Sequence, residues 1–76
     1  MSQNFIAVIP AFNEEKTIAG VLEKTSRYVD TIIVVDDCST DSTPEILQGY
    51  KVKTLRNPHN LGKGAALHRG FQEALT

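Results

Sequence analysis

Three short segments carry the side chains that could bind a ligand, and they lie at residues 10–14, 36–39 and 60–64. The first runs from a proline to an Asn-Glu pair, the second opens with two aspartates, and the third ends in Gly-Lys-Gly. Each follows an apolar, strand-like stretch. In an open parallel sheet, ligands bind at the edge formed by the carboxyl ends of the strands. The spacing therefore predicts that the three segments meet at one ligand-binding edge.

The acidic pair Asp36-Asp37 places oxygen acceptors where a buried strand is expected to end. A carboxylate there could accept a hydrogen bond from a base N–H or from ribose hydroxyls. Alternatively, one aspartate holds loop amides and the other caps the next helix. Carboxylates also suit Mg²⁺ or Mn²⁺. Neighbouring strand residues point to opposite faces, however, so the pair is not expected to bind a single ion.

The Gly62-Lys63-Gly64 segment opens the last predicted helix and could contact phosphate. Glycines let the backbone approach a ligand closely, the amides at a helix N-terminus attract anions, and the lysine adds a positive charge. The segment is not a Walker A loop, which requires a glycine and then a Ser or Thr where this chain has Asn57 and Gly64. A flexible helix start is the alternative interpretation.

Hydrophobic patterns predict that strands and helices alternate along the chain. The expected strands cover residues 5–9, 31–35 and 52–55, and Pro10 is expected to end the first. The expected helices follow Asn13 as N-cap, run from Ser42 or Thr43 to a stop at Gly49, and span residues 65–75. In the last helix we expect Leu67, Gly70, Phe71, Ala74 and Leu75 to share the buried face.

Two further expectations concern charged side chains near these elements. Glu14 is close enough to the first strand to reach a ribose or a base, whereas Glu15 is expected to face the positive end of its own helix. Arg69 is expected to lie on a solvated helix face.

The alternating order predicts an α/β fold with an open, doubly wound parallel sheet. The expected strand order is 3-2-1, with right-handed crossovers between the strands. The first two helices then cover one face of the sheet and the third covers the other. Such an arrangement is one Rossmann-like half of a larger domain.

Composition narrows the function classes. The 76 residues are 41% hydrophobic with a net charge of −1, so we expect no broad attraction to nucleic acid or anionic membrane. One cysteine, Cys38, cannot form an internal disulfide or a thiolate zinc site. No apolar run approaches the ~20 residues that span a bilayer, and no signal peptide is recognisable. We therefore expect a cytoplasmic setting, with the cytoplasmic face of the membrane as a further option for the parent protein.

Taken together, three motifs resemble the start of family 2 glycosyltransferases, which have the GT-A fold. They are Val-Ile-Pro-Ala-Phe-Asn-Glu-Glu at 8–15, Val-Val-Asp-Asp-Cys-Ser-Thr-Asp-Ser-Thr at 34–43, and Asn-Leu-Gly-Lys-Gly-Ala-Ala at 60–66. The resemblance covers nearly the whole chain and is nearest to the dolichyl- or polyprenyl-phosphate hexosyltransferases. It implies that residues 1–76 are the N-terminal, nucleotide-binding portion of a truncated glycosyltransferase domain.

The resemblance also implies the ligand, the reaction and the site. The donor would be a UDP- or GDP-linked sugar, and an acceptor such as a polyprenyl phosphate or a glycan would displace the nucleoside diphosphate at the anomeric carbon. A divalent cation, Mg²⁺ or Mn²⁺, is expected in the full-length parent. The implied nucleotide-binding residues are Pro10, Ala11, Phe12, Asn13, Glu14, Asp36, Asp37, Asn60, Gly62 and Lys63.

The sequence departs from the family pattern in two ways. Cys38 stands where the family usually has glycine, which predicts a turn less free to adopt positive φ. The family's Asp-X-Asp metal motif and its catalytic base lie beyond the Gly-Lys helix, so no catalytic residue or metal ligand is assigned and the chain by itself is expected to be inactive.

Two alternatives stand beside the glycosyltransferase interpretation. A receiver-like phosphate- or metal-sensing module would need an acceptor aspartate after the third strand, where the chain has Arg56-Asn57-Pro58. A non-catalytic structural fragment would self-associate through the exposed edge of the first strand.

Overall fold

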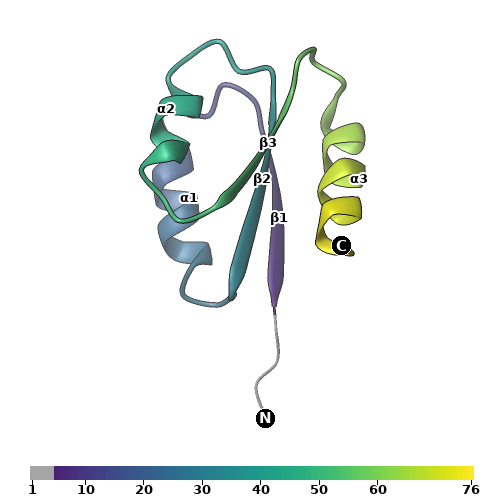
Figure 1. Cartoon of the computed structure of the whole chain (residues 1–76). Helices are drawn as coiled ribbons and strands as arrows, with labels where there is room; N and C mark the ends of the chain where they lie inside the picture. The colour runs from purple at the N-terminus through teal and green to yellow at the C-terminus, as the bar shows by residue number, and fades with distance from the viewer. Residues whose placement is uncertain (1–4) are drawn as a thin grey trace.

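The computed structural model describes residues 5–76, and its six elements alternate between strand and helix (Figure 1). The elements are β1 (Ile6–Ala11), α1 (Ile18–Thr25), β2 (Thr31–Asp37), α2 (Thr43–Gln48), β3 (Lys53–Asn57) and α3 (Lys63–Ala74). This order confirms the predicted α/β class.

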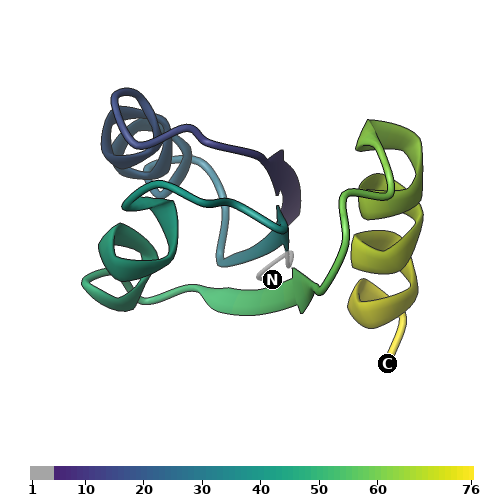
Figure 2. The ribbon, with the colours of Figure 1, turned by 90° about the horizontal axis from the view of Figure 1, so that it is seen from above.

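The three strands form one parallel sheet in the order β1-β2-β3. Seen from above, α1 and α2 lie on one face of this sheet and α3 lies alone on the other (Figure 2). The predicted strand order and the division of the helices between the two faces are therefore both confirmed.

β2 is the centre of the sheet and of the core. Its apolar residues are nearly all β-branched, a side-chain shape that suits a strand packed on both faces. Val34 packs into the cluster under α1 and α2, with Ile18, Leu22 and Leu47. Ile33 and Val35, on the opposite face, pack with Ala66 of α3, and it is this double coverage that drives the central strand to form.

β1 is longer than the sequence predicts, because Pro10 lies inside the strand and pairs with Val35. The expectation that Pro10 ends the strand is therefore wrong. Within residues 5–76, β1 has a strand neighbour on one side only, and a proline, which lacks an N–H, is tolerated on such an edge strand. The consequence is that Ala11 remains in register with Asp36 and is buried at the carboxyl edge of the sheet.

α1 begins later than predicted. Asn13 is not its N-cap; the helix starts at Ile18, after Thr17. The carbonyl of Glu14 accepts the N–H groups of Thr17 at 3.0 Å and Ile18 at 2.8 Å, so a tight turn precedes the helix. Residues 12–17 thus form a loop that crosses the carboxyl edge of the sheet before the helix descends along it.

α3 packs through smaller residues than predicted. Its buried residues are Ala66 and Gly70, whereas Phe71 and Leu75 are exposed, the latter by 88%. A Cβ on Gly70 would lie 2.2 Å from Cγ1 of Val8, so the helix backbone rests directly on the sheet. This close approach sets the contact stripe, which turns the two large apolar side chains outward. Of the described helices, none is long and apolar enough to cross a membrane.

Candidate functional site

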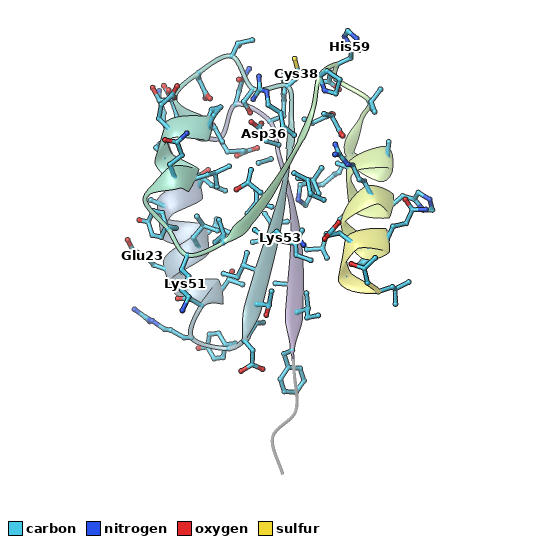
Figure 3. The ribbon with its side chains drawn as sticks, in the orientation of Figure 1. Glu23, Asp36, Cys38, Lys51, Lys53 and His59 are labelled. Atoms are coloured by element: carbon cyan, nitrogen blue, oxygen red, sulfur yellow. The ribbon has the colours of Figure 1, made fainter. Side chains whose placement is uncertain are left out.

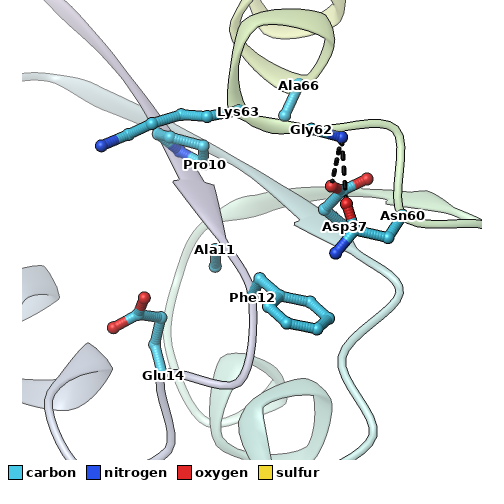
Figure 4. A pocket seen from close by; sticks show the side chains of 9 residues that line it. All are labelled: Pro10, Ala11, Phe12, Glu14, Asp37, Asn60, Gly62, Lys63 and Ala66. Carbon is cyan, nitrogen blue, oxygen red and sulfur yellow. Dashed lines mark hydrogen bonds between the residues drawn. The ribbon is translucent and has the colours of Figure 1, made fainter.

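A pocket of about 290 Å³ opens at the carboxyl edge of the sheet, between the loop after β1 and the start of α3 (Figure 4). Eight of the ten sequence-predicted site residues line it together; Asn13 and Asp36 do not. Its lining residues are Pro10, Ala11, Phe12, Glu14, Asp37, Asn60, Gly62, Lys63 and Ala66. Ala66 was missed by the sequence analysis, although it lies one helical turn after Lys63 and could have been found from that spacing.

Asp37 joins the end of β2 to the loop that leads into α3. Its Oδ1 accepts the side-chain amide of Asn57 and the backbone N–H of Leu61, each at 3.0 Å. Its Oδ2 accepts the N–H of Gly62, also at 3.0 Å. The hydrogen bond from the Leu61 N–H, together with those from Asn57 and Gly62, stabilises the ionised carboxylate more than burial destabilises it. These bonds therefore lower the pKa of Asp37. The pocket therefore has an ionised carboxylate in its wall at neutral pH.

Asp36 points away from the pocket, as expected for its position next to Asp37 on a strand. It is buried; its Oδ2 pairs with the Arg56 guanidinium, and its Oδ1 accepts the Ser39 N–H at 3.1 Å. Arg56 also donates to the Ser39 carbonyl at 3.1 Å. Asp36 thus holds the loop after β2, as in the alternative interpretation that gave the pair a structural role.

The apolar side of the pocket comes from β1 and the residue that follows it. Pro10 and Ala11 line the pocket, and the ring of Phe12, a residue that is 44% exposed, lies beside Asp37 (Figure 4). An exposed aromatic ring next to a carboxylate offers both a stacking surface and a hydrogen-bond acceptor. These are the two features by which proteins commonly hold a nucleobase.

The polar rim is built by the loop before α3. Gly62 has φ +93°, a conformation in which an L side chain is strained, and it precedes the first residue of the helix, Lys63. Asn60 Oδ1 accepts the Gly62 N–H at 3.0 Å and helps to fix this turn. As a result, the N-terminal end of α3 and the exposed Lys63 both face the pocket, where they favour an anion.

A second layer supports Asp37 from behind. Arg69 is not the solvated residue that the sequence predicts; it donates to the Arg56 carbonyl at 2.8 Å and to Oδ1 of Asn57. Asn57 in turn donates to Asp37. The periodicity of α3 could have placed Arg69 near the sheet, because it lies between the buried positions Ala66 and Gly70.

Asn13 and Glu15 bond to the loop after β2 and not to their own helix. Asn13 Oδ1 accepts the N–H groups of Thr40 at 2.8 Å and Asp41 at 3.3 Å. Glu15 Oε1 accepts the N–H of Ser42, the residue before α2, at 2.9 Å. The predicted roles at the start of α1 are therefore wrong, because the chain turns once more before that helix begins.

Cys38 adopts the positive φ that the sequence analysis considered difficult for it. Its φ is +65°, in the left-handed region that favours glycine. The turn after Asp37 is thus formed without glycine and carries backbone strain.

The structure offers no metal centre among residues 5–76, where no three His, Cys, Asp or Glu side chains lie close enough to share an ion. Asp36 and Asp37 face opposite sides of the sheet, so these carboxylates do not fit the divalent cation implied by the resemblance. No step is assigned to a metal on this part of the chain.

The chain is therefore an α/β domain with an open parallel sheet, and its pocket lies at the carboxyl edge, where sheets of this class bind their ligands. Its family is shown by sequence: the pattern of glycosyl transferase family 2 matches residues 6–76, and the chain belongs to that family.

Three relatives illustrate the similarity to known proteins. A dolichyl-phosphate beta-glucosyltransferase of Trichomonas vaginalis is 38% identical over 83% of this chain and 23% of its own length. A UDP-N-acetylglucosamine–dolichyl-phosphate N-acetylglucosaminyltransferase of Methanococcus voltae is 39% identical over 88% of this chain and 34% of its own length. An uncharacterised protein of Methanocaldococcus jannaschii is 40% identical over 93% of this chain and 34% of its own length. The chain thus spans about a quarter to a third of these relatives.

Proposed function

We propose that residues 1–76 form the nucleotide-sugar-binding portion of a family 2 hexosyltransferase. The observation that carries the proposal is that Phe12, Asp37 and Lys63 line one pocket, although they come from the loop after β1, the end of β2 and the start of α3. The aromatic face suits a base, and the buried carboxylate suits the N–H of that base or ribose hydroxyls. The cation at the helix N-terminus suits a diphosphate.

The size and chemistry of the pocket support a nucleoside diphosphate as the part bound here. A volume of about 290 Å³ is at the lower end of small-molecule sites, which suits a nucleoside better than an entire nucleotide sugar. The base would stack on Phe12 and donate to Asp37, while Lys63 and the free amides of α3 would face the phosphates. The hexose would extend beyond the described pocket.

The names of the relatives support a dolichyl or other polyprenyl phosphate as the acceptor. In the proposed reaction an acceptor phosphate oxygen forms the new bond to the anomeric carbon, and the bond to the nucleoside diphosphate breaks. The residues described here bind and orient the donor. We propose that the groups for the transfer step lie outside this portion and that these 76 residues alone do not catalyse it.

Backbone amide NMR during titration with UDP, GDP and dTDP, with and without Mn²⁺, tests the proposal. We expect at least one nucleotide to shift the amides of Ala11, Phe12, Glu14 and Gly62 together, with saturation. A folded, dispersed spectrum that shows no shift at millimolar concentrations of all three nucleotides would refute the proposed function.

A matched pair of lysine variants separates the pocket from general electrostatics. Lys63→Ala removes the cation at the pocket, whereas Lys51→Ala removes an exposed one near the other end of the sheet (Figure 3). We expect Lys63→Ala to weaken UDP binding about 3- to 10-fold, in line with one charge-assisted contact at a partly exposed site. Lys51→Ala should leave it unchanged, and uridine without phosphates should bind both variants equally.

A further inference from the structure

The loop after β1 and the loop after β2 are joined by a set of side-chain hydrogen bonds, here called the loop latch. Ser39 Oγ accepts the Asn13 N–H at 2.9 Å, and Thr43 Oγ1 accepts the Glu14 N–H at 2.9 Å. Asp41 Oδ2 accepts the Glu15 N–H at 3.2 Å. In the opposite direction, the Asn13 and Glu15 side chains accept backbone N–H groups of residues 40–42. Side chains on each side of the latch therefore accept hydrogen bonds from backbone N–H groups on the other side.

Asn13 is at the centre of this latch and is directly connected to the pocket wall. Its neighbours Phe12 and Glu14 line the pocket, whereas Asn13 itself does not. Its φ of +52° turns its side chain from the pocket toward residues 40 and 41. Asparagine is among the few residues other than glycine that tolerate a positive φ. Asn13 therefore forms the turn in the loop after β1 and also provides the oxygen that accepts the hydrogen bonds from residues 40 and 41.

The other half of the latch is tied to the sheet. Ser39 is buried; its N–H is bound by Asp36 and its carbonyl by Arg56, which come from β2 and β3. Its hydroxyl oxygen then accepts the Asn13 N–H. An unbroken series of bonds thus leads from the two strands to the loop that carries Phe12 and Glu14. Except for Asp37 at the end of β2, no residue of the segment 37–43 lines the pocket.

We infer that Asn13 is a positioning residue of the nucleotide site: it fixes Phe12 and Glu14 through the loop after β2 without touching the ligand. This inference rests on the proposed function. Without the Asn13 side chain, the loop after β1 loses its bonds to the N–H groups of Thr40 and Asp41. The other bonds of the latch remain, but Phe12 is held less firmly and must be ordered when the nucleotide binds. That ordering lowers affinity.

Two substitutions at the same position separate the bond acceptor from the turn. Asn13→Gly keeps the positive φ and removes the acceptor, whereas Asn13→Asp keeps both an acceptor and a residue that tolerates this φ. We expect Asn13→Gly to weaken UDP binding about tenfold, as for the loss of one or two hydrogen bonds, and Asn13→Asp to restore most of the affinity. Affinities are measured by NMR on chains whose dispersed spectra show that they are folded.

A purely structural role predicts a different result. It would lower the urea midpoint of Asn13→Gly but leave UDP affinity of the folded chain unchanged, and that outcome would overturn the inference. If the native chain binds no nucleotide, the proposed function itself is refuted, and this inference with it. Native binding with an unaffected Asn13→Gly variant refutes the inference alone.

Hydrogen exchange of the native chain provides a test that needs no variant. The Thr40 N–H is bound to Asn13, and Thr40 does not line the pocket. We expect saturating UDP to slow its exchange several-fold, while the Gly49 N–H, bound to Ile46 within α2, is unchanged. Equal exchange at Thr40 with and without bound UDP contradicts coupling through the latch, whether or not the variants fold.

Discussion

Replacing Gly70 with alanine is the most direct test of how α3 is held on the sheet. Gly70 is buried in the interior of α3, and a Cβ there would lie 2.2 Å from Cγ1 of Val8 and 3.2 Å from Cγ2 of Val35. Carbon atoms in contact are normally about 3.5–4.0 Å apart. The added methyl group is therefore more than an ångström too close to a β-branched side chain that has little freedom to rotate.

The magnitude follows from two opposing effects. Alanine is the better helix former by about 1 kcal/mol. Overpacking a well-packed core costs about 1–3 kcal/mol, and the overlap with Val8 places Gly70→Ala toward the upper part of that range. The expected net loss in the free energy of unfolding is about 1–2 kcal/mol. Gly20→Ala is the matched control: Gly20 is exposed within α1 with no atom within 4 Å of its added Cβ, so the helical gain of ~1 kcal/mol should appear alone.

Urea titrations followed by circular dichroism measure both variants against the native chain. We expect the midpoint to fall for Gly70→Ala and to rise for Gly20→Ala. The double variant Val8→Ala/Gly70→Ala removes the closest clashing atom. Its loss in the free energy of unfolding should therefore be smaller than the sum of the losses in the two single variants. If Gly70→Ala is as stable as the native chain, or both glycine variants gain equally, α3 does not rest on β1 as described.

Three further outcomes are expected. Cys38→Gly should raise the free energy of unfolding by about 0.5–1 kcal/mol in the same titrations, because glycine adopts the φ of +65° without strain. The greater conformational entropy of glycine in the unfolded chain offsets only part of this gain. An unchanged or lower urea midpoint contradicts the strain. Because the pKa of Asp37 is lowered on folding, the ionised carboxylate stabilises the fold fully above the unfolded pKa of 3.8, and this stabilisation is lost as the pH falls through the folded pKa. The difference between the urea midpoints at pH 6 and pH 3 should therefore be smaller in Asp37→Asn than in the native chain. If the difference is undiminished, the pH dependence comes from other groups. UDP should bind about tenfold or more tightly than GDP. Three N–H donors already bind the Asp37 carboxylate and leave one acceptor position, which is enough for the single imide N–H of uracil but not for the two adjacent donors of guanine. Equal affinities in NMR titrations would count against this.

The order of elements and the position of the pocket follow from local sequence patterns. Apolar runs such as Ile32–Val35 predict buried parallel strands, and polar residues directly after them must lie at the carboxyl edge. Asp37, Phe12 and Lys63 were for this reason expected in one place and do line one pocket. Whether they bind a nucleotide remains the prediction that the titrations above address.

The details that the sequence does not predict depend on partners far along the chain. Asn13 and Glu15 have the right chemistry to cap a helix, but their partners lie 27 residues away, in a loop whose position only the folded sheet determines. Likewise, the 3.6-residue periodicity of α3 allows Phe71 and Leu75 to be either buried or exposed. The close approach at Gly70 decides between these possibilities, and that approach depends on Val8 of another element.

The bonds that Asp37 makes also bear on when the pocket forms during folding. Its partners Asn57, Leu61 and Gly62 follow it by 20, 24 and 25 residues, so none of these contacts can form until long loops have closed. The strand pairs are equally non-local, since Ile6 pairs with Thr31 and Ile33 with Lys53. Chains dominated by such pairings fold more slowly than helical bundles of similar size. We therefore expect the pocket to be complete only once the sheet has formed, so that early compact states of the chain would have no complete pocket to offer a nucleotide.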